Sequence, residues 1–256
     1  MAIVLSWILT PLFLLALTGT LVIWQPVIVI SGVFGIEVQR RVVEAGNFLL
    51  VSYLRIMGGS LSVSWPKEAP AKGPVIVVSN HQSYFDIPIF IWIFRRYHAV
   101  FVAKKSLGRG LPSISYVLRN HGSALINRKS ARQALPAIKA LGTYIIDNHC
   151  AACIFPEGTR ARDGNLKTFK PHGLAALLKA APGVPVLPVA MDGTWRLMRY
   201  NLLPVPLFPK VHVEIFPPLD RAVNSDEEII SRCEDTLRAY FSGASDLTVQ
   251  GKTAKK

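Results

Sequence analysis

Cysteine is scarce in this sequence: three of its 256 residues are cysteines, Cys150, Cys153 and Cys233. A small and odd number of cysteines excludes the disulfide framework that stabilises many small secreted domains. We therefore interpret all three as reduced thiols in a cytoplasm-like compartment. Cys150 and Cys153 form a C-x-x-C beside His149, but zinc requires four ligands and Cys233 is distant in sequence. Buried strand cysteines are the favoured interpretation, and we expect neither a metal nor a cofactor.

Charge is missing from the first 36 residues, and Glu37, Arg40 and Arg41 follow directly. About 20 apolar residues are enough to cross a bilayer. A signal peptide would carry a basic residue before its apolar core, and none is present, so we do not expect cleavage. Because Pro11 and Pro26 interrupt the run, it predicts either one kinked span or two shorter helices that enter one leaflet.

Two further features predict how this segment meets a membrane. Trp7 and Trp24 carry the amphipathic rings that anchor at membrane interfaces, and the basic residues that follow favour a cytoplasmic location for the rest of the chain. The stretch 42–57 continues with helical spacing, either as a core helix or as a helix on the membrane surface. We expect residues 1–58 to form a membrane-anchoring helical segment, in the inner membrane if the source is bacterial.

From residue 59 onward, short apolar runs alternate with helical stretches. Helical spacing is found at 131–149 and 172–181, and Ser225 with Glu228 forms a capping box for a last helix that ends near Phe241. The apolar runs are 74–80, 98–104, 122–127, 151–156 and 184–190, and a more alternating run at 210–216 fits an edge strand. This order predicts an α/β domain at 59–243, with a mostly parallel central sheet flanked by helices. A basic, disordered tail is expected at 244–256.

Acidic residues are absent between Asp86 and Asp147, where ten lysines and arginines fall. The formal net charge of the whole chain is +13, which favours an anionic partner such as nucleic acid, an acidic membrane leaflet or a phosphorylated substrate. Within the interval, Lys104, Lys105 and Arg128 each follow an apolar run, so we expect them at one edge of the sheet. A lysine and a forked guanidinium at that edge suit a phosphate group.

His81 directly follows the run 74–80, and Asp86 lies five residues later. Ligands of open α/β sheets gather at the carboxyl ends of the strands. There a neutral imidazole can take a proton from an alcohol, while a carboxylate on its other nitrogen fixes the tautomer. The pair would serve as the base and orienter of a catalytic triad, with a substrate hydroxyl in place of the serine. Ser83 lies between them but lacks the G-x-S-x-G context of a nucleophile, and the H-x-x-x-x-D spacing alone is weak evidence.

The sequence EGTR at 157–160 follows another apolar run, 151–156, which predicts that it shares the edge with His81. Arg160 is a third candidate for a phosphate contact. Glu157 would either bind a substrate hydroxyl or pair with a neighbouring arginine, and the residues leave both open.

Four segments occur together in a familiar order. They are NHQSYFD (80–86), GSALINR (122–128), FPEGTR (155–160) and VPVLPVA (184–190). They resemble the four sequence blocks of the glycerolipid acyltransferase family, most closely the bacterial-type 1-acyl-glycerol-3-phosphate (lysophosphatidate) acyltransferases. The resemblance runs from about residue 74 to 216, and AKKSLGRGLP (103–112) is similar to the family's lysine-bearing segment. The second block departs from the pattern, because Asn127 stands where an aspartate is common and Ala124-Leu125 replaces a bulkier pair.

This resemblance implies a role for each candidate residue. His81 would deprotonate the 2-hydroxyl of a lysophosphatidate, Asp86 would orient His81, and no covalent acyl-enzyme would form. The acyl donor would be acyl-CoA or acyl-carrier protein, and the product phosphatidate. Phosphate contacts would come from Arg160, Arg128 and Lys104, with Lys105 as the alternate lysine, while Glu157, Gly158 and Thr159 would shape the acceptor pocket.

Two other functions fit part of the sequence. The acceptor would instead be another lysolipid, such as a lyso-ornithine lipid or a lysophospholipid with a head group, if the basic residues do not bind a bare phosphate. A basic, membrane-tethered binding module without catalysis would explain the charge of +13. It gives no reason for His81 and Asp86 to lie beside FPEGTR, so we expect no nucleic-acid partner.

Overall fold

A computed structural model describes residues 2–128 and 130–243 of the protein. Within these residues, strands form one sheet in the order β1-β7-β6-β2-β5-β3-β4. The strands are β1 (Ser60–Ser64), β2 (Val75–Ser79), β3 (Ala99–Lys104), β4 (Ala124–Ile126), β5 (Ala151–Ile154), β6 (Val186–Asp192) and β7 (Lys210–Ile215). Neighbouring strands are parallel except β6 and β7. The predicted α/β class with a mostly parallel sheet is confirmed, whereas the tail at 244–256 lies outside the described residues.

The prediction that 210–216 forms an edge strand is wrong. β7 lies between β6 and β1, and β1 occupies the edge. In β1, with the sequence SLSVS, Leu61 and Val63 pack against the core, while the serines of the other face are partly or fully exposed. This one-sided pattern is typical of a strand that is buried on one face only.

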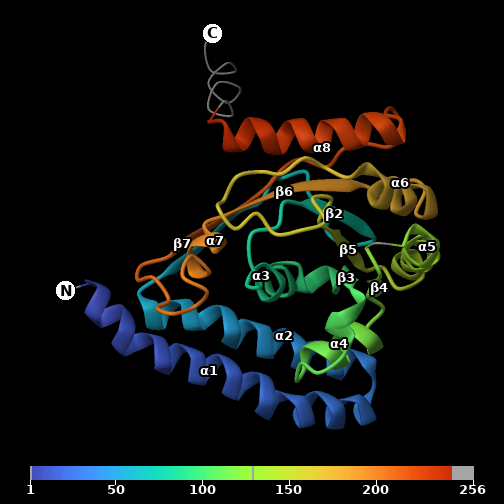
Figure 1. Cartoon of the computed structure of the whole chain (residues 1–256). Helices are drawn as coiled ribbons and strands as arrows, with labels where there is room; N and C mark the ends of the chain where they lie inside the picture. The colour runs from blue at the N-terminus through green and yellow to red at the C-terminus, as the bar shows by residue number, and fades with distance from the viewer. Residues whose placement is uncertain (1, 129, 244–256) are drawn as a thin grey trace.

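Helices cover both faces of the sheet (Figure 1). On one face lie α5 (Ala131–Asp147), α6 (Pro171–Ala180) and α8 (Asp226–Phe241), and on the other α3 (Asp86–Ile93), α4 (Ile114–Asn120) and the N-terminal helices. Short helical segments are η3 (Arg95–Tyr97), η4 (Lys105–Gly108) and α7 (Thr194–Leu197). Alternate residues of β2 enter the two cores: Val75 and Val77 on the side of α3, and Ile76 and Val78 on the side of α6. Such a strand, buried on both faces, explains why 74–80 reads as a continuous apolar run.

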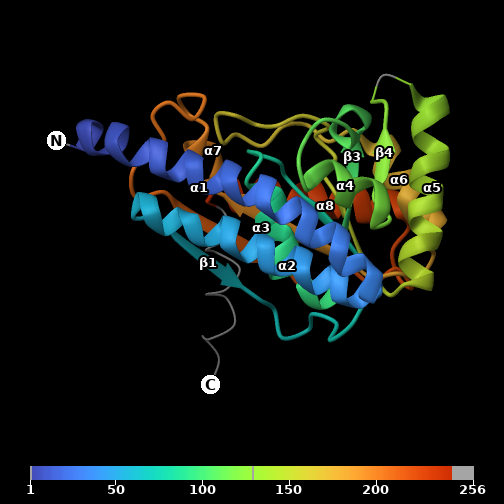
Figure 2. The same ribbon diagram turned by 90° about the horizontal axis from the view of Figure 1, so that it is seen from below.

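The N-terminal segment forms a hairpin of two helices. Helix α1 (Ala2–Ser31) runs through Pro11 and Pro26 without a break, and after η1 (Gly32–Phe34) the chain reverses at Gly35, whose φ of 102° suits glycine. Helix α2 (Ile36–Ser52) and η2 (Tyr53–Met57) return alongside α1, as Figure 2 shows from below. Between the two helices Trp24 donates a hydrogen bond to the carbonyl of Val42 (2.8 Å), so Trp24 packs inside this hairpin and is no free interfacial anchor.

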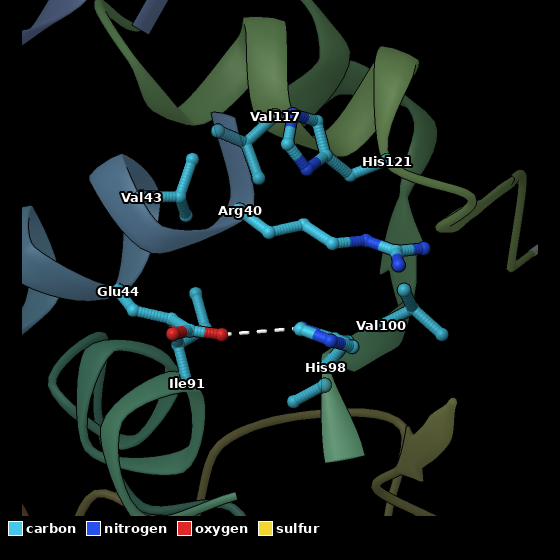
Figure 3. Close-up of a pocket in the computed structure, with 9 residues that line it drawn as sticks. Arg40, Val43, Glu44, Ile91, His98, Val100, Val117 and His121 are labelled. Carbon is cyan, nitrogen blue, oxygen red and sulfur yellow. Dashed lines mark hydrogen bonds and ion pairs between the residues drawn. The ribbon is translucent and has the colours of Figure 1, made fainter. Parts of the chain in front are cut away.

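Charged side chains connect α2 to the sheet (Figure 3). Glu44 points toward His98, with 3.2 Å between Oε1 and Nδ1. Arg40, one turn earlier, forms an ion pair with Glu37. Burial, and then the neighbouring Arg40 and His98, lower the pKa of His121 to about 4, so its imidazole is neutral at pH 7. The contact between Glu44 and His98 connects α2 to the residue that precedes β3.

Candidate active site

Hydrogen bonds on both sides connect the end of β2 to neighbouring segments of the chain. Asn80 is buried, and its amide group exchanges two hydrogen bonds with the backbone of Met191 on β6, both 2.8 Å. The N–H of His81 donates to Oε1 of Glu157 (2.9 Å), and its carbonyl accepts from the N–H of Ala161 (2.7 Å). Glu157 and Ala161 belong to the loop after β5. The backbone of His81 is therefore fixed from both sides of β2.

The imidazole of His81 lies against a buried carboxylate. Its Nδ1 is 2.7 Å from Oδ2 of Asp86, and its ring stacks on Phe155 with centroids 4.4 Å apart. The side chain of His81 is 12% exposed and that of Asp86 is fully buried. Because a carboxylate only accepts, this bond places the proton on Nδ1 and leaves the lone pair on Nε2. The arrangement can take a proton from a hydroxyl that reaches Nε2.

Asp86 itself is held by four donors. Oδ2 accepts from His81 and from the N–H groups of Gln82 (2.7 Å) and Ser83 (3.0 Å), and Oδ1 accepts from the hydroxyl of Thr194 (2.5 Å). The position of Asp86 in the first turn of α3 adds the favourable interaction of a carboxylate with a helix N-terminus. These contacts compensate for the cost of burying a charge.

Ser83 is fully buried, and its hydroxyl oxygen accepts a hydrogen bond from the N–H of Phe85 (2.9 Å). It therefore fixes the turn between His81 and Asp86. This geometry agrees with the expectation from the sequence that Ser83 is no nucleophile.

Glu157 lies behind the histidine. It is 1% exposed, and Oε2 has no partner among the described residues. Burial raises the pKa of Glu157 to about 7, although hydrogen bonds from the backbone N–H groups of His81 and Lys167 lower it in part. The sequence left two interpretations of Glu157 open. Pairing with an arginine is absent among the described ion pairs. Direct binding of a substrate hydroxyl is not supported either, because Glu157 does not line the groove described next.

A groove of about 1330 Å³ is lined in part by His81. It is larger than the roughly 300–1,000 Å³ of an ordinary small-molecule pocket. Its walls are mostly apolar and come from α1, α2, α3, β3 and α4, with Leu21, Leu50, Ile91, Phe101 and Val117 among the lining residues. A groove of this size with mostly apolar walls suits a long hydrocarbon chain.

Basic side chains line the groove where it reaches His81. The predicted residues Lys104, Arg128, Thr159 and Arg160 all line it, whereas Lys105 and Gly158 do not. We call the basic residues Lys104, Arg128 and Arg160 the rim of the groove. Arg128 donates a hydrogen bond to the carbonyl of Gly158 (2.6 Å), which connects the rim to the loop after β5. The structure therefore brings together the cations that the sequence placed at one edge.

The guanidinium of Arg160 lies over the ring of Tyr84, 3.6 Å from its centroid. Two further cations, Arg162 and Lys167, also line the rim, and Asp163 is the acidic residue among them. Sequence reasoning did not select Arg162 or Lys167, although both follow EGTR closely. An excess of positive charge beside His81 suits an anionic ligand.

Metal ligation has no support within residues 2–128 and 130–243, since no cluster of three or more His, Cys, Asp or Glu side chains is placed to hold an ion. The cysteines of HCAAC are buried and free. Burial raises the pKa of the Cys153 thiol above its ordinary value. Cys153 is thus an apolar core residue of β5, as the sequence predicted.

Comparisons with known proteins agree with this geometry. A sequence model of the family described as Acyltransferase matches residues 60–192, which include His81, Asp86 and the EGTR loop. The chain belongs to the acyltransferase family. Curated relatives of this acyltransferase chain include the 1-acyl-sn-glycerol-3-phosphate acyltransferases of Borreliella burgdorferi and Salmonella typhimurium. The first is 34% identical and the second 32%, over 59% and 60% of this chain and 58% and 60% of those proteins.

The fold comparison covers more of the acyltransferase chain. The crystal structure of the 1-acyl-sn-glycerophosphate (LPA) acyltransferase PlsC from Thermotoga maritima superposes with a TM-score of 0.76 at 25% identity, and the match covers all of both chains. In sequence, the chain spans somewhat more than half the length of the first curated relatives, between 52% and 58%. The predicted family resemblance is confirmed.

Thr194 is the contact that sequence reasoning missed in this chain. It lies two residues beyond the segment that matches the family, and it follows β6 at the start of α7. One signal was available: VPVLPVA is a predicted strand, and the polar residue after a parallel strand faces the same edge as His81. The hydrogen bond to Asp86 depends on the strand order, which the sequence does not specify.

Proposed function

We propose that the protein transfers an acyl group from a thioester donor to the 2-hydroxyl of 1-acyl-glycerol-3-phosphate, which gives phosphatidate. The observation that carries this proposal is the position of His81. Its Nδ1 is bound to Asp86, and it lines a mostly apolar groove that basic side chains also line. A substrate with a phosphate, a free hydroxyl and a hydrocarbon chain matches these three features in one molecule.

The reaction would proceed in two proton transfers. The acceptor hydroxyl gives its proton to Nε2 of His81 as its oxygen attacks the thioester carbonyl. The tetrahedral intermediate then collapses, the C–S bond breaks, and the thiolate takes the proton from the imidazolium. Asp86 stabilises the imidazolium and keeps the proton of Nδ1 in place. No covalent acyl-enzyme is needed, because the nucleophile belongs to the acceptor.

The acceptor phosphate would be bound by Arg128, Arg160 and Lys104. All three line the groove that His81 also lines. Charge-assisted hydrogen bonds from guanidinium groups to phosphate are among the stronger polar contacts in proteins. The stacking of Arg160 on Tyr84 restricts the guanidinium, which reduces the entropy lost on binding. Glu157 holds His81 in position, because its Oε1 accepts a hydrogen bond from the N–H of His81.

The acyl chains would enter from a membrane. Helix α1 is part of a segment, Ala2–Phe34, that is long and apolar enough to cross a bilayer, and 11% of an apolar 18-residue window within it is buried. The apolar groove is lined by α1 and α2, so a chain in the groove would lie next to the lipid face of the hairpin. Attachment of residues 1–58 to the membrane, with the catalytic domain at 59–243 on the cytoplasmic face, would bring both substrates to His81.

The experiment is a panel of acceptors. Purified protein in vesicles receives one labelled acyl-CoA and, in separate reactions, lysophosphatidate, lysophosphatidylethanolamine, lysophosphatidylcholine and a lyso-ornithine lipid. We expect phosphatidate to form fastest, because only lysophosphatidate presents a bare phosphate monoester to the basic rim. A faster reaction with an acceptor whose phosphate carries a head group, or with one that has no phosphate, would contradict the proposal that lysophosphatidate is the acceptor. The absence of any diacyl product with either acyl-CoA or acyl-carrier protein would contradict the activity.

A further inference from the structure

The loop between α7 and β7, residues 198–209, combines apolar and basic side chains on an exposed surface. Tyr200, Leu203 and Phe208 are 47%, 57% and 64% exposed. Arg196 and Arg199 lie exposed at its start, and no acidic residue occurs from 193 to 213. Large apolar side chains that gather on one exposed loop mark a contact with a partner or a lipid surface.

This loop is firmly attached to the N-terminal hairpin. The hydroxyl of Ser6 on α1 donates to the carbonyl of Val205 (2.5 Å), and the N–H of Val205 donates to the hydroxyl of Thr10 (2.9 Å). The N–H of Phe208 donates to the carbonyl of Met57, at the end of η2 (2.7 Å). Figure 2 shows the loop beside the first half of α1, on the side away from α2, and uncovered from below.

The first turns of α1 next to this loop are themselves apolar and exposed. Ile3, Trp7 and Ile8 are 56%, 53% and 64% exposed, while Ser6 and Thr10 face the loop and are buried. The exposed apolar surface of α1 therefore continues into the loop. Inward-facing residues of the same loop, Met198 and Leu202, line the groove. The loop thus lies between the groove and the surface that α1 exposes.

We propose that residues 198–209 form a second membrane-contacting element, which places Leu203 and Phe208 among the lipids of an anionic bilayer surface. This inference rests on the membrane attachment of the hairpin in the proposed function. The occupant is a lipid surface because the apolar patch is continuous with α1, and because the adjacent arginines complement anionic head groups. The loop would orient the domain so that the groove opens toward the bilayer.

The test uses a polarity-sensitive fluorophore at single positions. The native Cys150, Cys153 and Cys233 are buried, so a thiol-reactive probe will label an introduced cysteine selectively. We would compare Leu203→Cys in the loop, Ile8→Cys in α1, and the control Val223→Cys. Val223 is 76% exposed in the connection between β7 and α8, and Figure 1 shows α8 on the opposite side of the molecule from α1.

With vesicles that contain phosphatidylglycerol and nitroxide-labelled lipid, probes at positions 8 and 203 should shift to the blue and lose fluorescence, while the probe at 223 should do neither. The quenching at 203 should increase with the content of phosphatidylglycerol. Quenching at 8 but not at 203 would overturn the inference and leave the proposed function intact. Quenching at neither position would overturn both this inference and the membrane attachment of the hairpin.

A double variant provides an independent readout. Leu203→Ser with Phe208→Ser should reduce partitioning into vesicles roughly tenfold, because two large apolar side chains are removed from the contact with lipid. Val223→Ser should leave partitioning unchanged. Acyl transfer in detergent micelles, where no bilayer is needed, should be the same for both variants and thereby show that the fold is intact. Equal partitioning of the two variants would contradict the proposal.

Discussion

The carboxylate of Asp86 and the cations of the groove rim lie on the same sheet edge, but the structure holds them in opposite ways. Asp86 is fully buried and accepts four hydrogen bonds from groups fixed by the backbone or by packing. Lys104 and Arg128 are exposed at the rim. The base is therefore prepared before substrate arrives, whereas these rim cations are open to solvent and to a phosphate. Changes beside Asp86 should reduce kcat, and changes on the rim should raise KM.

The largest effect is expected from Asp86→Asn. The amide carries no charge, and its NH2 group can donate to Nδ1, which favours the wrong tautomer of His81. We expect kcat for acyl transfer to fall by roughly 10³- to 10⁴-fold, as for the equivalent change in a serine-protease triad, with little change in acceptor KM. Initial rates with labelled acyl-CoA measure this, and thermal unfolding checks that the variant is folded. A loss of kcat below about tenfold would contradict the role of Asp86.

Thr194 offers a graded version of the same test. Thr194→Val removes the hydroxyl that donates to Oδ1 of Asp86 but keeps the shape, whereas Thr194→Ser keeps the hydroxyl. A hydrogen bond to a charged group is worth about 1.5–3 kcal/mol, so Thr194→Val should lower kcat roughly 10- to 100-fold. Thr194→Ser should restore most of the rate. If both variants lose the same activity, packing rather than the hydrogen bond determines the effect.

On the rim, Arg160→Ala should mainly raise acceptor KM, roughly tenfold, because one charge-assisted contact to the phosphate is lost. Arg132→Ala is the matched control, since Arg132 is exposed on α5 and does not line the groove. Acceptor-dependent rates at fixed acyl-CoA separate kcat from KM. Equal acceptor KM values for the two variants would contradict a role of Arg160 in binding the acceptor.

The smallest effect concerns Glu157 and pH. Its pKa in the folded protein, about 7, lies above the ordinary value of 4.5, so the native state binds the extra proton. Stability from this group is complete below about pH 4.5 and decreases as pH rises toward 7, by at most about 1.4 kcal/mol per pH unit. Glu157→Gln keeps an oxygen for the N–H of His81 but does not titrate. Compared with that variant, wild-type protein should lose unfolding free energy between pH 4.5 and 7, as measured by urea unfolding in micelles. Parallel profiles would contradict the assigned pKa.

The sequence predicted the elements whose residues are buried on both faces or capped. The runs 74–80 and 151–156 correspond to β2 and β5, and the capping box at Ser225 begins α8 as expected. Helix α3 was not predicted, because eight apolar-rich residues give no amphipathic period. β1 was missed because its apolar residues alternate with serine, and its pairing with β7 is a contact between distant residues.

For the site, strand ends alone indicated that His81, Asp86, Arg128 and EGTR converge. They did not reveal which side chains hold His81 and Asp86 in position. The contact of Glu157 with the His81 backbone and that of Thr194 with Asp86 join residues 76 and 108 positions apart. Such long-range contacts follow from the strand order, and a single sequence gives no local signal for them.

The most direct test of the account compares His81→Ala with Ser83→Ala. The two residues lie two positions apart in the sequence, and they separate a mechanism with a histidine base from one with a serine nucleophile. Rates of phosphatidate formation from lysophosphatidate and labelled acyl-CoA would be normalised to folded protein. If the nucleophile is the acceptor hydroxyl and His81 is its base, His81→Ala abolishes turnover, and Ser83→Ala retains it at a rate reduced only by its structural role. Near-normal turnover by His81→Ala, or its loss in Ser83→Ala with unchanged folding, would contradict the account.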